Sequence, residues 1–271
     1  MKRLACLVLA FMLAAACGAP FPAQAAEIRP VGAVIGTDKA GVEIRRVRVA
    51  GADIGYKLLG QGEPLVLICG LNMTMDRWPQ EVLAALGQKR QLILFDNRGM
   101  GSSTADATPF SYPLFAADVL GLMDALGVQR ADVLGFSMGS TITQQLVLNH
   151  PERVKKAIIH ATTIDGAPVA KGLSQRGLTD PIVLRQLEAS AAWKTPLDKL
   201  PGVTNQVLLL VGTADPVVGV ESSKVIAAAI PGAWLVQIKN ATHGLILEAP
   251  EAFTKIVLNF LDVDATVPLR K

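Results

Sequence analysis

Five short runs of consecutive apolar residues limit the fold of this chain more than any other feature. They are LVLI at 65–68, LILF at 92–95, VLGF at 133–136, AIIHA at 157–161 and VLLLV at 207–211. A strand with one face in water alternates apolar and polar residues, whereas a strand buried on both faces is apolar throughout. Because helical patterns separate the runs, the sequence predicts an α/β fold with helices on both faces of a mostly parallel sheet.

The predicted elements alternate along most of the chain. Strands are expected at 43–49, 53–58, 65–69, 91–95, 132–136, 154–161, 206–212 and 234–239. Helices are expected at 76–86, 114–126, 138–149, 182–193, 221–230 and 250–262. The first two strands resemble an antiparallel pair, and the others fit parallel strands joined by right-handed crossovers.

The length of 271 residues suits one domain with a small insertion. Residues 26–42 are rich in Gly, Ala and Pro and are interpreted as a loose lead-in to a domain at 43–271. Residues at about 166–200 hold helix formers and breakers but no strand pattern, so we predict a helical insertion there. Its apolar side chains, such as Leu173 and Trp193, are interpreted as packing onto the core in preference to lining a substrate pocket.

Residues 1–25 have the pattern of a signal peptide. Lys2 and Arg3 precede the apolar run 4–16, and Ala23-Gln24-Ala25 provides small residues for cleavage after Ala25. We therefore expect an exported protein, either periplasmic or secreted. Two alternatives stay open, namely a lipoprotein acylated at Cys17 and an uncleaved membrane anchor.

Cleavage there changes the charge and cysteine content. Losing Lys2 and Arg3 leaves 24 basic against 23 acidic residues, a net charge of +1. This balance gives no electrostatic reason to expect nucleic-acid binding. Of three cysteines only Cys69 remains, so no internal disulfide is expected.

The segment Gly135-Phe136-Ser137-Met138-Gly139 lies between a predicted strand and a predicted helix. In such a sharp turn the central serine adopts a strained backbone conformation, and glycines two residues away avoid a clash. The hydroxyl of Ser137 then stands at the positive end of the following helix. We predict that Ser137 is a nucleophile.

A serine nucleophile needs a base, and three histidines are available. His150 precedes Pro151 at a helix end, and His160 lies in an apolar strand, where a structural role is favoured. His243 follows the last predicted strand, at the sheet edge where ligands bind in open α/β folds. We therefore predict His243 as the general base.

Three aspartates follow predicted strands and compete for the role of orienting that histidine. Asp215, in the turn Gly212-Thr213-Ala214-Asp215-Pro216, is preferred over Asp165. Asp96 precedes the serine in the chain and is interpreted as a buttress of a turn. The predicted order is thus Ser137, Asp215, His243.

With these motifs the chain resembles the α/β-hydrolase superfamily over about residues 43–262. The matching blocks are Phe95–Ser102, the turn at Ser137, Gly212–Pro216 and Thr242-His243-Gly244. The resemblance implies an eight-stranded, mostly parallel sheet with a small helical lid. It also implies an oxyanion hole made by the backbone N–H groups of Leu71 and Met138. Cys69 stands where the family usually has histidine, and we interpret it as a small buried residue.

The predicted function is hydrolysis of a small carboxylic ester or related acyl substrate through an acyl-enzyme. Other reactions of the same residues stay open: lactone, peptide or carbon–carbon hydrolysis, cofactor-free peroxidase chemistry and acyl transfer. A non-catalytic binding protein on this fold is a further alternative. We expect a small-molecule acyl substrate as the partner and no cofactor or metal, while membrane contact requires acylation or an uncleaved anchor. The oligomeric state is left open.

Overall fold

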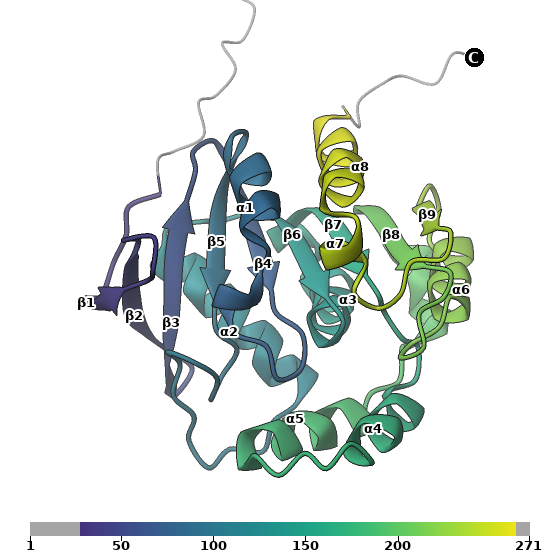
Figure 1. Cartoon of the computed structure of the whole chain (residues 1–271), viewed down its shortest axis with the longest axis horizontal. Helices are drawn as coiled ribbons and strands as arrows, with labels where there is room; N and C mark the ends of the chain where they lie inside the picture. Colours follow the sequence, from purple (N-terminus) through teal and green to yellow (C-terminus); the bar gives the residue numbers. More distant parts are fainter. Residues whose placement is uncertain (1–27, 264–271) are drawn as a thin grey trace, which may run out of the picture.

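The computed structural model describes residues 28–263, so the predicted signal peptide at 1–25, with Cys17, lies outside the described residues. Nine strands form one sheet (Figure 1), in the order β1-β2-β3-β5-β4-β6-β7-β8-β9. They are β1 Ala33–Thr37, β2 Glu43–Val49, β3 Ala52–Leu59, β4 Glu63–Ile68, β5 Arg90–Phe95, β6 Ala131–Phe136, β7 Val154–His160, β8 Gln206–Gly212 and β9 Trp234–Ile238. Strands β1, β2 and β3 pair antiparallel, β3 also runs antiparallel to β5, and all pairs from β5 to β9 are parallel.

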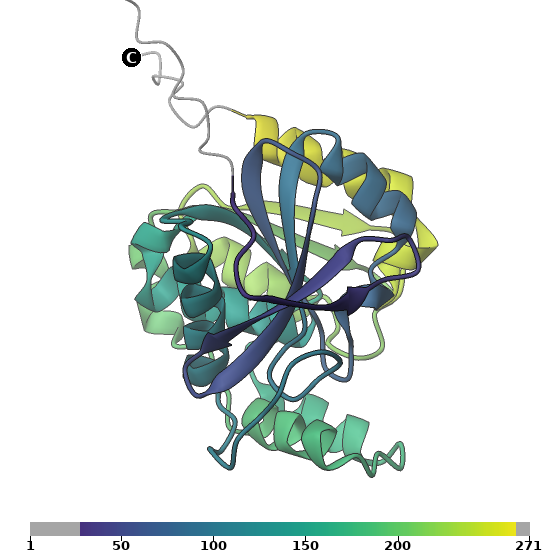
Figure 2. The ribbon, with the colours of Figure 1, turned by 90° about the vertical axis from the view of Figure 1, so that its left-hand side faces the viewer.

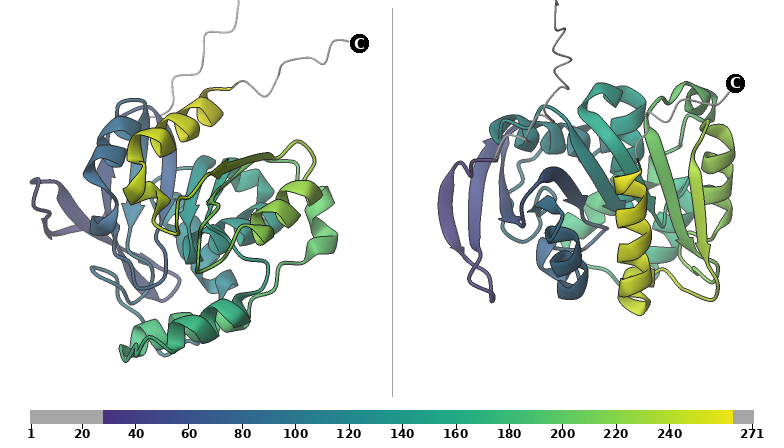
Figure 3. Two further views of the ribbon diagram at one scale, coloured as in Figure 1. Left: turned by 45° about the vertical axis from the view of Figure 1, so that its right-hand side comes forward. Right: turned by 90° about the horizontal axis from the view of Figure 1, so that it is seen from above.

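Helices cover both faces of this sheet. They are α1 Gln80–Gly87, α2 Tyr112–Ala125, α3 Met138–Asn149, α4 Gly166–Ser174, α5 Pro181–Ala191, α6 Glu221–Ala229, α7 Leu245–Glu248 and α8 Pro250–Asp262. Side chains of α2, α3 and α6 pack on one face, and those of α1, α7 and α8 on the other. Helices α1 and α8 lie side by side (Figure 2), and α8 crosses the middle of its face when seen from above (Figure 3). The predicted fold class is therefore confirmed.

The sheet has nine strands and not the expected eight, because β1 falls within the predicted lead-in. All five residues of β1 are exposed, and the strand is held by antiparallel pairing with β2 at the sheet edge. An exposed strand with glycine in it buries no apolar face, so its sequence carries no periodic signal. Its formation depends on the free edge of β2.

The helix expected at 76–86 is also different. Residues Met75–Arg77 form a short 3-10 helix, η1, and α1 begins only at Gln80. Between them Trp78 is extended with ψ of 132°, as expected for the residue before Pro79. The proline thus divides the predicted helix in two.

Residues between β7 and β8 form α4, α5 and the 3-10 helix η3, Leu197–Gly202. Helix α5 matches the expectation at 182–193 within two residues, whereas α4 was not predicted as a helix. The two helices pack against each other and lie below the sheet in Figure 1, near the carboxyl ends of the parallel strands. Of the apolar residues there, Leu187 and Trp193 are buried, and Leu184 is exposed.

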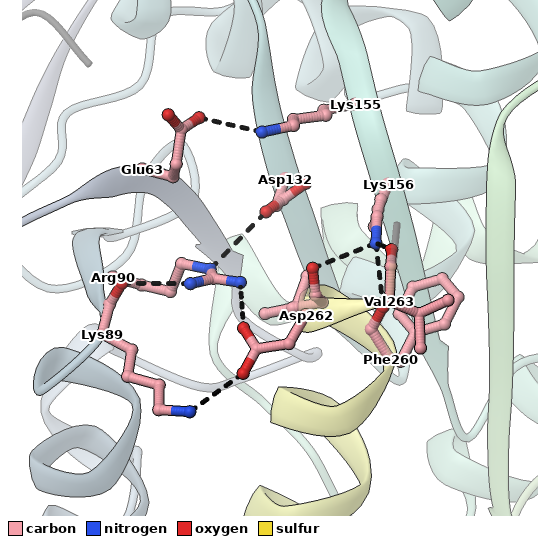
Figure 4. A network of polar contacts seen from close by, with 10 residues as sticks. Glu63, Lys89, Arg90, Asp132, Lys155, Lys156, Phe260, Asp262 and Val263 are labelled. Atoms are coloured by element: carbon pink, nitrogen blue, oxygen red, sulfur yellow. Dashed lines mark hydrogen bonds and ion pairs between the residues drawn. The ribbon is translucent and has the colours of Figure 1, made fainter. Parts of the chain in front are cut away.

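A charged network lies at the opposite edge of the sheet (Figure 4), where β5, β6 and β7 begin. Lys156 donates hydrogen bonds of 3.0 Å to the carbonyls of Phe260 and Leu261, and also to that of Val263. A cation at a helix carboxyl end satisfies carbonyls that lack helical partners. The network therefore holds the end of α8 against the sheet.

Asp132 in this network gives a prediction about pH and stability. Burial raises the pKa of Asp132 to about 6, although Lys155, Arg90 and Lys156 act to lower it. Because the folded protein binds this proton more tightly than the unfolded chain, the contribution of Asp132 to stability falls as pH rises from about 4 to about 6. In Asp132→Asn this fall is absent. Urea unfolding measures the difference in unfolding free energy between wild type and Asp132→Asn. This difference should fall by about 1–3 kcal/mol as the pH rises from about 4 to about 6.

Asp262 supplies the matched control for that experiment. The hydrogen bond from Lys89 holds the pKa of Asp262 below its usual value, and Arg90 acts in the same direction. Its contribution to stability is therefore present above pH 4 and lost as pH falls, opposite in sign to that of Asp132. If the unfolding free energies of Asp132→Asn and Asp262→Asn had the same dependence on pH, the opposite pKa shifts assigned to these two residues would be wrong.

Candidate active site

Ser137 occupies the turn between β6 and α3. Its φ of 53° and ψ of −116° lie in a region where a residue with a side chain is strained. Its N–H donates to the carbonyl of His160 at 2.9 Å, which fixes the turn to the neighbouring strand. Ser137 thus stands at the amino end of α3, whose positive end favours negative charge on the nearby oxygen.

Two glycines allow this turn to form. A Cβ on Gly135 would lie 2.1 Å from the carbonyl oxygen of Gly139. A Cβ on Gly139 would lie 2.2 Å from the carbonyl oxygen of Ile68, in β4. Both distances are far below van der Waals contact, so any side chain at either position displaces the backbone that carries Ser137.

Three side chains that are far apart in the sequence meet at this edge of the sheet. The Nε2 atom of His243 lies 3.0 Å from Oγ of Ser137. The Nδ1 atom of His243 lies 2.8 Å from Oδ2 of Asp215. Asp215 follows β8 and His243 follows β9, so both come from loops at the carboxyl ends of neighbouring parallel strands. The arrangement provides a continuous hydrogen-bonded path from a carboxylate to a hydroxyl.

The carboxylate of Asp215 is fully buried behind His243. Burial by itself raises the pKa of Asp215, but the hydrogen bond and charge of His243 and the amides of Val217 and Val218 outweigh it, so the pKa lies below its usual value. Those amides donate to Oδ1 at 2.8 and 3.1 Å. Asp215 therefore stays ionised and can orient His243 and stabilise its protonated form.

The rival residues lie elsewhere. His160 is buried in β7, its Nδ1 is 3.0 Å from the carbonyl of Leu210, and burial lowers its pKa to about 4. His150 ends helix α3. Asp165 caps the amino end of α4 by accepting from Ala167 at 3.0 Å. None of the three makes a side-chain hydrogen bond to Ser137 within residues 28–263.

Leu71 and Met138 carry the two backbone N–H groups expected to bind an oxyanion. Within residues 28–263 neither N–H has a hydrogen-bond partner, and both residues line the space around Ser137. A Cβ on Gly70 would lie 3.3 Å from Cβ of Ser137, so glycine lets this loop approach the serine closely. Two free donors beside a serine hydroxyl suit the stabilisation of a developing negative oxygen.

Cys69 lies in the same loop but is buried. Its sulfur accepts a hydrogen bond from Nε1 of Trp78 at 3.3 Å, and burial raises the pKa of its thiol. A buried thiol with a raised pKa is a poor nucleophile. The structural interpretation of Cys69 therefore fits its surroundings.

Three side chains hold the loop that carries Leu71. Asp96 accepts from the N–H of Met75 at 2.7 Å, and Asn97 donates to the carbonyl of Cys69 at 3.0 Å. Gln186, on α5, accepts from the N–H of Asn72 at 2.9 Å. Asp96 was expected to support a turn, whereas Gln186 was missed. It lies 114 residues from Asn72 in the chain, and no local pattern links the two.

Ser137 opens onto a cavity of about 380 Å³ that also contains His243. Ser137 also lines a smaller space of about 30 Å³, together with Thr141 and Val218. Leu173 of α4 lines both spaces. The expectation was that this residue of the insertion packs on the core in preference to lining a pocket. No group of three potential ligands in the described part of the chain is placed to hold a metal ion. No helix between residues 28 and 263 has the length and apolarity of a membrane span.

Comparison with known families agrees with the fold. The family model described as the alpha/beta hydrolase fold matches residues 63–179. A second model, described as TAP-like protein, matches residues 183–270. The chain belongs to the α/β-hydrolase superfamily and is an enzyme of this class.

Individual relatives carry the names of several activities. A Synechocystis protein named as a non-heme chloroperoxidase is 38% identical over 121 residues, which span 44% of each chain. A Mycobacterium tuberculosis protein named as the non-heme bromoperoxidase BpoC is 28% identical over 77% of this chain and 97% of its own. The enol-lactonase structure from Burkholderia xenovorans LB400 is 26% identical, with a TM-score of 0.71, over 80% of this chain and 100% of its own.

Proposed function

We propose that this protein hydrolyses carboxylic esters through a covalent acyl-enzyme on Ser137. The observation that carries this proposal is the pair of contacts made by His243, at 3.0 Å to Oγ of Ser137 and at 2.8 Å to Asp215. A base within hydrogen-bond reach of a hydroxyl, and itself oriented by a buried carboxylate, is the arrangement that activates a serine.

In the proposed reaction His243 takes the proton of Ser137 as its Oγ attacks the ester carbonyl. The N–H groups of Leu71 and Met138 hold the carbonyl oxygen as it gains negative charge. His243 then donates the proton to the departing alcohol oxygen, and the C–O bond breaks. Water, deprotonated by His243, releases the acid and restores the Ser137 hydroxyl.

A fluorophosphonate probe tests the proposal directly, because only an activated serine reacts with it. Stoichiometric labelling of Ser137, located by peptide mass spectrometry, together with hydrolysis of nitrophenyl esters, is the expected result. A panel of esters, lactones and peptides then ranks the substrate classes. Absence of labelling and of turnover on every member of the panel would overturn the proposal.

Perhydrolysis is a second candidate, favoured by the peroxidase names of two relatives. The same acyl-enzyme attacked by hydrogen peroxide in place of water yields a peracid and free Ser137. Peracid formed from acetate ester and peroxide oxidises bromide, which gives a spectrophotometric assay. Bromide oxidation that needs Ser137, peroxide and an acyl donor together would support it, and hydrolysis alone would exclude it.

Gln186 is expected to position the oxyanion donors. Gln186→Ala removes the acceptor for the N–H of Asn72, next to Leu71, and loosens a loop that matters most in the transition state. We expect kcat to fall about tenfold while KM changes less. Steady-state kinetics on one nitrophenyl ester provides the measurement. Glu188→Ala, on the exposed side of the same helix, is the control. A purely structural role for Gln186 would lower stability without changing kcat in the folded fraction.

A further inference from the structure

Two spaces of unequal size meet at Ser137, and together they constrain the substrate. The larger, of about 380 Å³, contains His243 on one wall. The smaller, of about 30 Å³, is bounded by Tyr112, Thr141 and Val218 and does not include His243. An ester bound at Ser137 must divide its two halves between these spaces.

The position of His243 decides which half goes where. In the proposed reaction His243 donates a proton to the leaving oxygen, so the alcohol half must lie on its side, in the larger space. The acyl half then enters the smaller space. A volume of about 30 Å³ has room for about two water-sized groups, which suits an acetyl or propionyl chain.

Part of the wall of the smaller space is fixed by packing, whereas Val169, Leu173 and Val218 are half-buried. Tyr112, Met138 and Ser190 are all buried, and the hydroxyl of Tyr112 lies 3.2 Å from that of Ser190. A close-packed wall expands only at a cost in free energy, so longer acyl chains are expected to be excluded.

The larger space is electropositive. Arg77, from η1, and Arg176, just after α4, line it, and no Asp or Glu does. Between residues 28 and 263 neither guanidinium makes a hydrogen bond or an ion pair with another side chain. The nearby carboxylates are already engaged, Asp76 by Lys57, Asp215 by His243 and Glu248 by Thr242. Arginine binds carboxylates through paired, charge-assisted hydrogen bonds.

We propose that the substrate is an ester of a two- or three-carbon acid with a larger alcohol or phenol that carries a carboxylate. This inference rests on the proposed ester hydrolysis and adds both the size of the acyl group and the charge of the leaving group. Arg77 and Arg176 bind the carboxylate, and the space beside Thr141 and Val218 receives the short acyl chain.

The leaving group is tested with 4-acetoxybenzoate and its neutral methyl ester, each rate divided by that of uncatalysed hydrolysis. At low salt, kcat/KM is expected to be about tenfold higher for the anion. The preference should shrink at least fivefold in Arg77→Met/Arg176→Met, and also in about 0.5 M NaCl, which screens exposed charges. Arg48→Met, at an exposed arginine of β2, should keep the full preference.

The acyl group is tested with acetyl, propionyl and hexanoyl esters of one phenol. The kcat/KM for hydrolysis of the hexanoyl ester is expected to be at least tenfold lower than that for the acetyl ester. Val218→Ala enlarges the smaller space while keeping the N–H that Val218 donates to Asp215, and it should move the ratio toward hexanoyl.

The outcomes of these experiments distinguish failure of this inference from failure of the proposed ester hydrolysis. Ser137-dependent hydrolysis of neutral acetate esters with no preference for the anion, or with equal rates for acetyl and hexanoyl esters, would overturn the inference and leave the proposed function standing. Absence of both labelling and hydrolysis would overturn both.

Discussion

Replacing Ser137 with alanine is expected to lower kcat for ester hydrolysis by a factor on the order of 10⁴ or more. The loss follows because no acyl-enzyme can form without Oγ, and His243 then has no hydroxyl at 3.0 Å to deprotonate. Residual turnover should come only from binding and from the donors of Leu71 and Met138 acting on a water molecule. Stopped assays with high enzyme concentration on a nitrophenyl acetate measure the residual rate.

Ser174→Ala is the matched control for that loss. Ser174 is an exposed serine at the end of α4, and its hydroxyl donates only to the carbonyl of Lys171. Its variant should hydrolyse the ester within about twofold of the wild-type rate, as usual for surface positions. If Ser137→Ala is folded, by circular dichroism, and retains more than about a tenth of the wild-type kcat, Ser137 is not the nucleophile.

The largest effect on stability is expected for Asp118→Ala. Arg98 is completely buried and binds Asp118 through two hydrogen bonds, of 2.5 Å from Nη2 and 3.0 Å from Nε. Burial raises the pKa of Asp118 to about 6, despite Arg98, so at pH 8 the carboxylate is ionised and paired. Removing it leaves a guanidinium that cannot lose its proton inside the protein. Such a break of a buried ion pair costs about 3–5 kcal/mol of unfolding free energy.

Asp106 provides the comparison for this pair. Its carboxylate lies 3.5 Å from Nη1 of the same arginine but is 39% exposed. Asp106→Ala should therefore lower the unfolding free energy much less than Asp118→Ala. Urea unfolding at pH 8 measures both variants. Equal losses in the two variants would show that burial does not decide the strength of these pairs.

Asp118→Ala should also reduce activity in the folded fraction, because the pair anchors the loop beneath the site. Arg98 follows Asp96 and Asn97, which hold Met75 and Cys69 in the oxyanion loop. Loosening this chain of contacts displaces Leu71 from Ser137. The effect on kcat should be smaller than that of Gln186→Ala, which acts one residue from Leu71.

The apolar runs predicted most of the sheet correctly, because burial on both faces leaves a local signature in each strand. The same logic failed at β1, whose residues are all exposed and whose pairing partner lies elsewhere in the chain. The predicted helix at 76–86 began too early, because its amphipathic pattern continues across Pro79, whereas α1 begins at Gln80. The steric restriction that Pro79 places on the preceding Trp78 overrode the periodicity.

At the site, sequence order and strand position brought Ser137, Asp215 and His243 forward as candidates, and the folded chain brings their side chains into contact. Gln186, Arg77 and Arg176 had no comparable signal. Gln186 reaches Asn72, and Arg77 and Arg176 line the space at Ser137, only because the fold brings the insertion and a short 3-10 helix to the site.

The sequence by itself determined the α/β class, the alternation of strands and helices along the chain, and the turn with a serine between two glycines. These features depend on residues within a few positions of one another, through hydrophobic periodicity and the steric limits of one turn. Only the tertiary structure decided the two unequal spaces around Ser137, the placement of Arg77 and Arg176 beside it, and the support that Gln186 of α5 gives to the loop at Asn72. They depend on contacts between segments far apart in the chain, and no local pattern links such pairs as Gln186 and Asn72, which lie 114 residues apart.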